Sequence, residues 1–517
     1  MPLSHLFLAF LFLQAPKPGS VSGTVTNAAT GGPVRKAHIT LRANEQTYTA
    51  TSDAEGHFTV AGVAPGILQA QVECPGFQAI YSREPIRVAE DQQVTDVALT
   101  LIPNGVITGR VLDENGDPMP QIPVEAALET YDPMGRKLTP RGSMQTDDRG
   151  VYRFFDLPAG RYFLMANPSL AGGGWNGHVH TEAVEKAYVA TWFPAAASSR
   201  EATANQLAPG AELGGIDIRM RKTRVYHVRG KVVAPGSQQR LEAPVILSQC
   251  QMVGEGQFLY GPILRDGSFD VSGLEPGTWC ATVTHVTDLA HGYYARQTVT
   301  VTDHDVNDVI LTAAATGQVR GQALLDGGTP ASLQRTPVNL VPLETPGRTM
   351  TTTIQADGAF TLVNTEPGPY RVEVNLRGLY LKAVRFNGQD SPDGRILVPS
   401  SGGQLTLSFA TDGGDIGGTA SGEGALITAF SSTGLAVAPE TAVAGSGGSF
   451  VLRSLAPGDY QVLAWDTREF GLVQYGEFRK LFESRAVTVT VRAKGHETVT
   501  LTPISAAEIE AAKARLQ

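Results

Sequence analysis

Two kinds of side chain able to bind ligands gather in one stretch of this 517-residue chain. The first kind is the histidine pair of His178-Val-His180, which Glu182 and Glu185 follow closely. Alternate side chains of a strand point to the same face, so two imidazoles and a carboxylate there would suit zinc or copper. The competing interpretation is a pair of solvated loop histidines. We favour it, and we expect no metal and no cofactor.

Aromatic rings in the same stretch suggest a different chemistry. An exposed ring with a polar edge is suited to stacking on a sugar, and Trp175, set among glycines, is the best placed for exposure. Trp192-Phe-Pro194 alternates with apolar neighbours, and we favour burial against a core for it. The candidate ligand-binding residues are Trp175, His178, His180, Tyr188 and Trp192.

Motifs of catalytic sites are missing elsewhere in the chain. His496-Glu497 is followed by Thr, Val and Thr, so the zinc pattern His-Glu-x-x-His is absent. Neither a Gly-x-Ser-x-Gly elbow nor a phosphate-binding Gly-x-x-x-x-Gly-Lys-Ser/Thr loop occurs. Asp147-Asp148 and Asp303-x-Asp305 are candidates for Ca²⁺, but Asp is common in tight turns for backbone reasons alone. The sequence therefore predicts no catalytic residues and no enzyme.

Composition limits the class of protein further. The chain has 57 Gly and 32 Pro with 18% charged and 42% hydrophobic residues, which indicates frequent turns and too much apolar content for disorder. Its formal net charge is −9, and without a basic patch the attraction that dominates nucleic-acid binding is missing. We expect many short strands and no nucleic-acid partner.

An internal repeat organises the chain. A Gly is followed two residues later by an aromatic residue, ten residues later by a second Gly, and two residues after that by a large apolar residue. The five instances are Gly56/Phe58/Gly66/Leu68, Gly150/Tyr152/Gly160/Tyr162, Gly267/Phe269/Gly277/Trp279, Gly358/Phe360/Gly368/Tyr370 and Gly448/Phe450/Gly458/Tyr460. The first Gly ends a tight turn, and a Pro-Gly turn then reverses the chain. The pattern predicts a strand pair whose large apolar side chains are buried.

Each signature follows an opening strand in which an apolar residue, a Gly and a Val or Ala alternate. The instances are Val21-x-Gly23-x-Val25, Ile107-x-Gly109-x-Val111, Val228-x-Gly230-x-Val232, Val319-x-Gly321-x-Ala323 and Ile416-x-Gly418-x-Ala420. Successive first glycines are 94, 117, 91 and 90 residues apart, about the size of a seven-stranded sandwich. The prediction is an all-β chain of about five tandem seven-stranded antiparallel β-sandwiches with a short C-terminal helix.

The domain boundaries follow from this spacing. The predicted sandwiches are residues 17–103, 104–224 with an insertion at 168–209, 225–315, 316–411 and 412–503, with a terminal helix in 504–517. Ser505-Ala-Ala-Glu508 is a capping box, and Ile504 and Ile509 are placed as a hydrophobic staple, so the helix should cover residues 505–516. Because each sandwich has its own core and the linkers are short, neighbouring sandwiches should be only modestly coupled.

The N-terminus and the cysteines bear on the compartment. The apolar run from Leu6 to Leu13 is too short to cross a bilayer and has the length of a signal-peptide core. Residues 1–16 are predicted to be a signal peptide, and a mis-assigned start codon is the alternative. No later segment reaches the roughly 18 apolar residues of a membrane span. Of the three cysteines, Cys250 and Cys280 fall in one unit, where a bond between neighbouring strands is conceivable, and Cys74 stands alone.

The repeat resembles a known family. The stretch from Thr146 to Tyr162, with its turn, aromatic residue and later Gly-x-Tyr, is similar to the carboxypeptidase regulatory-like domain, and the resemblance extends over nearly all of residues 20–500. It implies a transthyretin-like or carbohydrate-binding-like β-sandwich, as in multi-repeat exported proteins of soil bacteria. The family takes its name from a domain appended to metallocarboxypeptidases. None of the ten His residues here has Glu three positions later, so the zinc pair of the catalytic partner is absent.

The resemblance also raises a covalent possibility. Related B-type repeats of surface adhesins contain a self-formed bond between Lys and Asn or Asp, for which Lys36 and Lys231 are the candidates here. Neither has a clear acidic context in the sequence, so we favour plain surface lysines.

The functional expectation is a secreted, periplasmic or cell-surface-associated protein that binds or spaces other molecules without catalysis. Its expected partners are polysaccharide or envelope proteins. The alternative is a carbohydrate-binding protein that uses the exposed aromatic residues of the second unit. An enzyme assigned through the family name is the weakest alternative.

Overall fold

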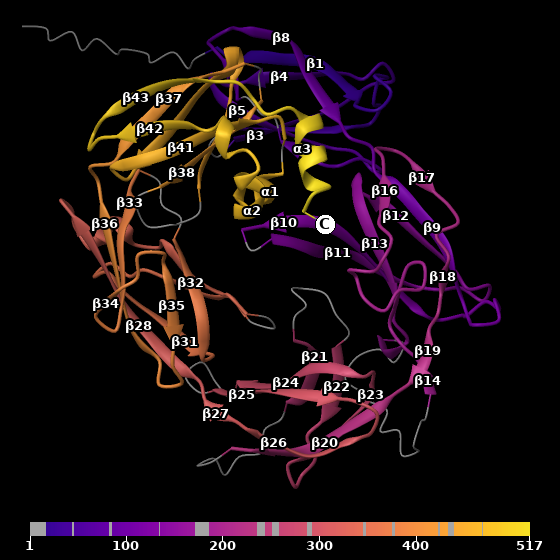
Figure 1. The fold of residues 1–517 in the computed structure, drawn as a ribbon. Coiled ribbons are helices and arrows are strands. Elements are labelled where there is room, and N and C mark those ends of the chain that lie inside the picture. Colours follow the sequence, from indigo (N-terminus) through magenta and orange to yellow (C-terminus); the bar gives the residue numbers. More distant parts are fainter. Residues whose placement is uncertain are drawn as a thin grey trace, which may run out of the picture. The chain divides into compact units, whose positions relative to one another are not determined.

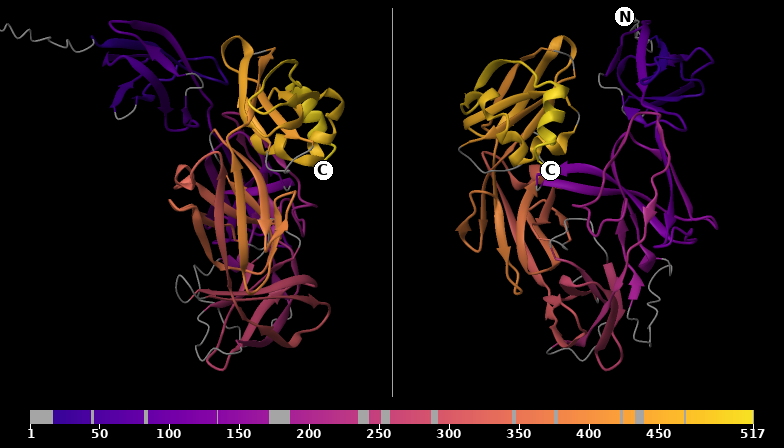
Figure 2. Two further views of the ribbon diagram at one scale, coloured as in Figure 1. Left: turned by 90° about the vertical axis from the view of Figure 1, so that its left-hand side faces the viewer. Right: turned by 45° about the vertical axis from the view of Figure 1, so that its right-hand side comes forward.

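The computed structural model describes residues 17–43, 46–81, 85–133, 135–170, 186–234, 243–250, 258–286, 292–344, 348–374, 378–421, 424–432, 439–467 and 469–516. Strands dominate, and the α-helices of these residues, α1 to α3, belong to the C-terminal part of the chain (Figures 1 and 2). The chain divides into two compact units, residues 1–108 with 153–161 and 205–215, and residues 109–152 with 162–204 and 216–517. The strands form tandem β-sandwiches, which confirms the predicted fold class.

The first and second sandwiches each pair a smaller sheet with a larger one. In the first, one sheet runs β4 (His57–Val63), β1 (Gly19–Asn27), β8 (Gln93–Leu101), and the other runs β3 (Gln46–Thr51), β2 (His38–Ala43), β5 (Gly66–Glu73), β6 (Ile80–Tyr81), with β7 (Ile86–Val88) also on β5. In the second, one runs β12 (Val151–Leu157), β9 (Gly105–Leu112), β17 (Glu212–Leu213), with β18 (Ile218–Arg219) also on β9, and the other runs β11 (Gly135–Gln145), β10 (Pro123–Asp132), β13 (Gly160–Ala166), β15 (Thr191–Trp192), with β16 (Asn205–Leu207) also on β13. A separate pair joins β14 (Lys186–Tyr188) to β19 (Lys222–Arg224).

The third and fourth sandwiches repeat this plan. In the third, one sheet runs β23 (Ser268–Leu274), β20 (Tyr226–Val233), β26 (Val306–Thr312), and the other runs β22 (Phe258–Pro262), β21 (Pro244–Gln249), β24 (Gly277–Val286), β25 (Gly292–Val301), β27 (Ala314–Ala315). In the fourth, one runs β31 (Ala359–Thr365), β28 (Gly317–Asp326), β36 (Gly403–Ala410), β33 (Tyr380–Phe386), β34 (Gln389–Asp390), and the other runs β30 (Met350–Thr353), β29 (Pro337–Pro342), β32 (Gly368–Val374), β35 (Arg395–Val398).

The fifth sandwich adds helices to the plan. One sheet runs β40 (Ser449–Leu455), β37 (Gly414–Ala420), β43 (His496–Leu501), and the other runs β39 (Glu440–Val443), β38 (Leu426–Ser431), β41 (Gly458–Trp465), β42 (Val487–Val491). The helices are α1 (Phe470–Gln474), α2 (Gly476–Lys480) and α3 (Ala506–Lys513). The capping box of Ser505 and Glu508 forms at the start of α3 as predicted, although the helix ends at Lys513.

One feature of the strand order differs from the prediction. In all five sandwiches the opening strand lies inside its sheet and runs parallel to the closing strand, for example β1 to β8 and β20 to β26. The Pro-Gly turn also carries the chain from one sheet to the other, since β4 pairs with β1 whereas β5 pairs with β2. A period of two residues is common to all strands, so the sequence pattern distinguished neither parallel from antiparallel pairing nor a sheet crossing from a hairpin.

The signature side chains form the cores. All ten are buried, none more than 5% exposed, and they are Phe58, Leu68, Tyr152, Tyr162, Phe269, Trp279, Phe360, Tyr370, Phe450 and Tyr460. Two of the polar tips bond to carbonyls nearby in the sequence: Tyr370 donates its hydroxyl to the carbonyl of Glu366 at 3.0 Å, and Trp279 donates its indole N–H to the carbonyl of Glu275 at 3.0 Å. The hydroxyl of Tyr152 donates to the distant carbonyl of Ile216. The predicted burial of these residues is confirmed.

The glycine of the opening strand has a structural reason. Phe58 lies directly opposite Gly23, and Phe269 lies opposite Gly230. A Cβ on Gly23 would lie 2.0 Å from the carbonyl oxygen of Val97 in the parallel closing strand, far closer than real Cβ contacts. A side chain there would push the closing strand out of the sheet, so the glycine permits the parallel pairing in this sandwich. A Cβ would lie equally close to a carbonyl of the closing strand at Gly230 and Gly418.

Candidate functional site

Part of the sequence-predicted site lies outside the described residues. Trp175, His178 and His180 fall within residues 171–185, as do Glu182 and Glu185. The metal and glycan interpretations of these residues stay predictions. The structure describes Tyr188 and Trp192, and it does not bring them together.

Tyr188 belongs to a polar cluster on the second sandwich. Its hydroxyl donates a hydrogen bond to Oε2 of Glu114, whose Oε1 accepts a bond from Nζ of Lys222 at 3.1 Å. The same ammonium lies 5.0 Å from the centre of the Tyr188 ring. The bond from Tyr188 lowers the pKa of Glu114 to about 2, and in turn raises the pKa of Tyr188 to about 12. One face of the Tyr188 ring is therefore already occupied by a cation.

Trp192 is buried, as the sequence analysis favoured. It is 5% exposed and packs with Phe163, Met165 and Leu138 against the outer face of the sheet that contains β10 and β13. The insertion residues around Trp192 thus form a second, smaller core on this sandwich. A ring in that position stabilises the fold and is not open to a flat ligand.

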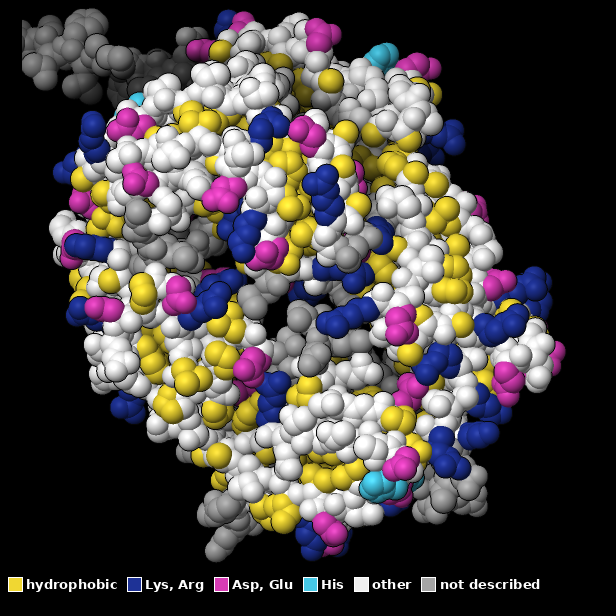
Figure 3. Space-filling view, in the orientation of Figure 1, with side chains coloured by type: hydrophobic (Ala, Val, Ile, Leu, Met, Phe, Trp, Pro, Cys, Tyr) yellow, Lys and Arg dark blue, Asp and Glu magenta, His cyan; other side chains and the backbone are white. Residues whose placement is uncertain are grey.

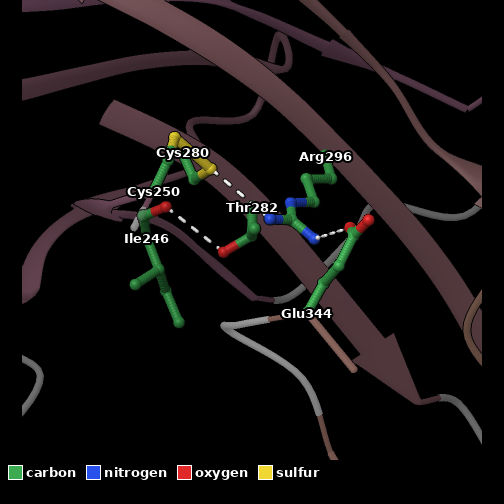
Figure 4. Close-up of a disulfide and its surroundings, with 6 residues drawn as sticks. All are labelled: Ile246, Cys250, Cys280, Thr282, Arg296 and Glu344. Carbon is green, nitrogen blue, oxygen red and sulfur yellow. Dashed lines mark hydrogen bonds and ion pairs between the residues drawn. A yellow bond between two sulfur atoms is a disulfide. The ribbon is translucent and has the colours of Figure 1, made fainter. Parts of the chain in front are cut away.

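A disulfide in the third sandwich forms the bond that the sequence left open. Cys250, directly after β21, is bonded to Cys280 on β24 (Figure 4). Arg296 on β25 lies beside it, with Nη2 directed to Sγ of Cys280 at 3.7 Å and Nη1 donating to Glu344 at 3.1 Å. The bond ties the end of one strand to its neighbour and closes a span of 30 residues. Cys74 is free.

A charged network on the other sheet of the third sandwich was missed by sequence reasoning. Arg229 on β20 bonds Asp270 on β23 at 2.9 Å and Asp305 at 2.8 Å. Nδ1 of His227 lies 2.6 Å from Asp270. The signal was present in the alternation of His227 and Arg229 along the opening strand, opposite acidic residues on both neighbours. The network cross-links three strands and leaves Asp305 engaged by a guanidinium, which does not favour the calcium interpretation.

The other candidate positions are a turn aspartate and two exposed lysines. Oδ1 of Asp147 accepts the backbone N–H groups of Arg149 and Val151, at 2.9 and 2.8 Å, and so closes the turn before β12. Lys36 and Lys231 are exposed. Within the described part of the chain, no group of three or more His, Cys, Asp or Glu residues is arranged to hold a metal ion.

Both signs of charge occur on the face of the molecule seen in Figure 3. Lys and Arg side chains are interspersed with Asp and Glu over much of this face, among hydrophobic and uncharged polar side chains. Among the described residues, no helix is long and apolar enough to cross a membrane.

Comparison with known proteins places the first sandwich in a family. Residues 20–101 match the model of the carboxypeptidase regulatory-like domain. The first sandwich is such a domain, and the resemblance inferred from the repeat is confirmed for these residues. No curated protein matches the chain.

Solved structures resemble the chain only distantly. They include the Bacillus anthracis TIE protein (13% identity, 57% of this chain and 51% of that one, TM-score 0.17). Others are the major pilin subunit BcpA of Bacillus cereus (10%, 76% and 99%, 0.18) and the minor pilin GBS52 of Streptococcus agalactiae (13%, 43% and 100%, 0.21). The chain spans about half the length of the TIE protein. TM-scores near 0.2 mean that these proteins do not superpose on the chain as wholes.

Proposed function

We propose that this chain is an exported, non-enzymatic spacer or binding protein of the cell envelope, built from carboxypeptidase regulatory-like repeats. The observation that carries the proposal is that the conspicuous side chains of the repeats have structural roles. The signature residues build cores, and the acidic side chains of the third sandwich bond to Arg229 and His227 across its strands.

Two features support export. The apolar run from Leu6 to Leu13 has the length of a signal-peptide core. The bond between Cys250 and Cys280 fits an oxidising compartment, because disulfides persist outside the cytoplasm and are rare within it.

Fractionation of the source cells tests this proposal. We expect the protein in the envelope or the medium, with a mature N-terminus near residue 17 by mass spectrometry and with Cys250 and Cys280 oxidised. A cytoplasmic protein that keeps Met1 and carries reduced thiols would overturn it. Hydrolysis of C-terminal peptide reporters by the purified protein, abolished by a chelator, would overturn the non-enzymatic part.

Carbohydrate binding is the alternative proposal, and it depends on Trp175. Polysaccharide pull-down with the intact chain should then lose its signal in Trp175→Ala and keep it in Trp192→Phe, because Trp192 is a core residue. If both variants keep the signal, or if the chain binds envelope proteins alone, the spacer proposal is favoured.

A further inference from the structure

The β10–β11 hairpin of the second sandwich ends in an aromatic tip that is buried away from its own core. Tyr131, near the end of β10, is 8% exposed and belongs to the hydrophobic cluster of the C-terminal helices. That cluster contains Leu472 and Val473 of α1, Phe478 of α2 and Ile509 of α3. We call the helices α1, α2 and α3 the helical cap, and residues 129–133 with 135–136 the hairpin tip.

The cap is shaped for the backbone of the tip. A Cβ on Gly471, inside α1, would lie 1.7 Å from the carbonyl oxygen of Tyr131. Glycine inside a helix costs about 1 kcal/mol relative to Ala, so α1 carries an unfavourable residue at the position where the strand of the tip approaches. The neighbouring Gly476 meets nothing closer than the end of the Arg479 side chain at 3.9 Å. The close approach is therefore specific to Gly471.

The side chains of the tip complete the fit. The rings of Tyr131 and Tyr475 are stacked with their centres 6.4 Å apart. The Tyr131 hydroxyl donates to Glu129 at 3.1 Å, and Glu129 is paired with Arg136 across the hairpin at 2.9 Å. The tip thus satisfies its own polar groups and offers an apolar ring, as a docking element must.

We propose that the helical cap is a receptor for the hairpin tip and that the two form a clasp within one chain. The clasp joins segments more than 300 residues apart in the sequence, so the third and fourth sandwiches lie in a closed loop of chain. Tension applied at the two ends then passes through the clasp and bypasses these two sandwiches until the clasp opens. This deepens the proposed spacer function into a spacer of two lengths, and it adds a coupling between the second and fifth sandwiches to the modest coupling expected between neighbours.

The test compares two matched substitutions in the purified full chain, Gly471→Ala and Gly476→Ala. Both place Ala in a short helix, where Ala is the more favourable residue, but only the first collides with the Tyr131 carbonyl. Gly471→Ala should lower the sedimentation coefficient and remove hydrogen-exchange protection from the hairpin tip. Gly476→Ala should leave both unchanged. Protection of β13 and β41 in both variants reports that the second and fifth sandwiches remain folded.

Two outcomes would overturn the proposal. One is a Gly471→Ala protein with the sedimentation and tip protection of the wild type. The other is a wild-type dimer by light scattering in which a cross-link between tip and cap joins two differently labelled copies, because the receptor would then serve a second chain. Both measurements use purified protein and are independent of where the cell places it, so a cytoplasmic location would defeat the spacer proposal without touching the clasp.

Discussion

The first and fifth sandwiches have cores of the same kind but differ on the outer face of one sheet. In β5 of the first, the outward residues Gln69 and Glu73 are exposed to solvent. In β41 of the fifth, the outward residues Leu463 and Trp465 are 3% and 0% exposed, because α1, α2 and α3 cover them. Glu73 and Trp465 stand at the same position of the repeat, seven residues after the second glycine.

This difference shows that the inner and outer faces of a sheet in this fold have separate roles. The inner face, carrying the signature residues, makes each unit a sandwich. The side chains of the outer face determine whether that face is exposed to solvent or buried by further elements of the chain. It is buried by the segment around Trp192 in the second sandwich and by the helices in the fifth.

The largest expected effect comes from removing the covered ring of the fifth sandwich. Trp465 packs against Phe478 and Phe482 with ring centres 5.6 and 5.4 Å away and donates its indole N–H to Thr428 at 2.8 Å. Trp465→Ala should lower the unfolding free energy of this sandwich by about 3–5 kcal/mol, measured by calorimetry. Glu73→Ala, at the matching exposed position, should change the first sandwich by less than about 0.5 kcal/mol. Equal effects would erase the distinction between the two faces.

The third sandwich is an intermediate case that can sharpen the comparison. Its outward residues Cys280 and Thr282 are 1% and 7% exposed, and it is held by the disulfide. Reduction should lower its unfolding free energy by about 2–4 kcal/mol, since the unfolded chain regains the freedom of the closed loop. Calorimetry with and without reductant should shift one transition. A shift in the first sandwich, which contains only the free Cys74, would contradict this assignment.

Substitution of the opening-strand glycine tests whether the opening and closing strands pack equally closely in the first and fifth sandwiches. A Cβ would lie 2.0 Å from the Val97 carbonyl at Gly23 and 1.8 Å from the Val499 carbonyl at Gly418. Gly23→Ala and Gly418→Ala should each destabilise their sandwich by about 1–3 kcal/mol, seen as a lower denaturation midpoint. Gly32→Ala, whose Cβ would meet only a side chain at 3.4 Å, serves as the control for backbone effects. A harmless Gly23→Ala would mean that the parallel strand is not tightly packed.

The smallest expected effect concerns the polar cluster of Glu114, Tyr188 and Lys222 in the second sandwich. Because its folded pKa is lowered to about 2, ionised Glu114 stabilises the β14–β19 pair above the ordinary carboxyl pKa of about 4.3. That contribution is lost as the pH falls from about 5 towards 2. Hydrogen exchange of β14 and β19 should rise over this range, and Glu114→Gln should remove the pH dependence. An unchanged profile in the variant would assign the effect to another group.

The sequence predicted the inner faces because they repeat. Five copies of a glycine and aromatic signature with a fixed spacing report the same buried positions, and Phe58 and Phe450 are as buried as expected. A residue with positive φ also recurs six positions after the first glycine, at Gly62, Asp156, Gly273, Asn364 and Ser454. It escaped notice because four residue types occupy it, and only the backbone conformation is shared.

The outer faces could not be predicted from the repeat. Leu463 and Trp465 alternate with inner-face residues, so the end of their strand, residues 462–465, is continuously apolar. Such a run indicates burial on both sides but does not indicate what covers the outer side. The clasp depends on Tyr131 and Gly471, two residues that no local pattern relates. For the polar cluster, Tyr188 was identified, but its partners Glu114 and Lys222 are distant in sequence and unremarkable in type.

The parallel pairing of first and last strands has a consequence for how the protein emerges when it is made or exported. Ser20 pairs with Gln93 and Asn27 with Leu101. One edge of β1 can pair with β4 early, but its other edge stays unpaired until almost the whole repeat has left the ribosome or the translocation pore. Each sandwich therefore completes in a single late step, and the sandwiches complete one after another from the N-terminus, as domains do during synthesis. A chain truncated between an opening strand and its own closing strand would leave that opening strand with an unpaired edge. Such an edge pairs with other chains and aggregates.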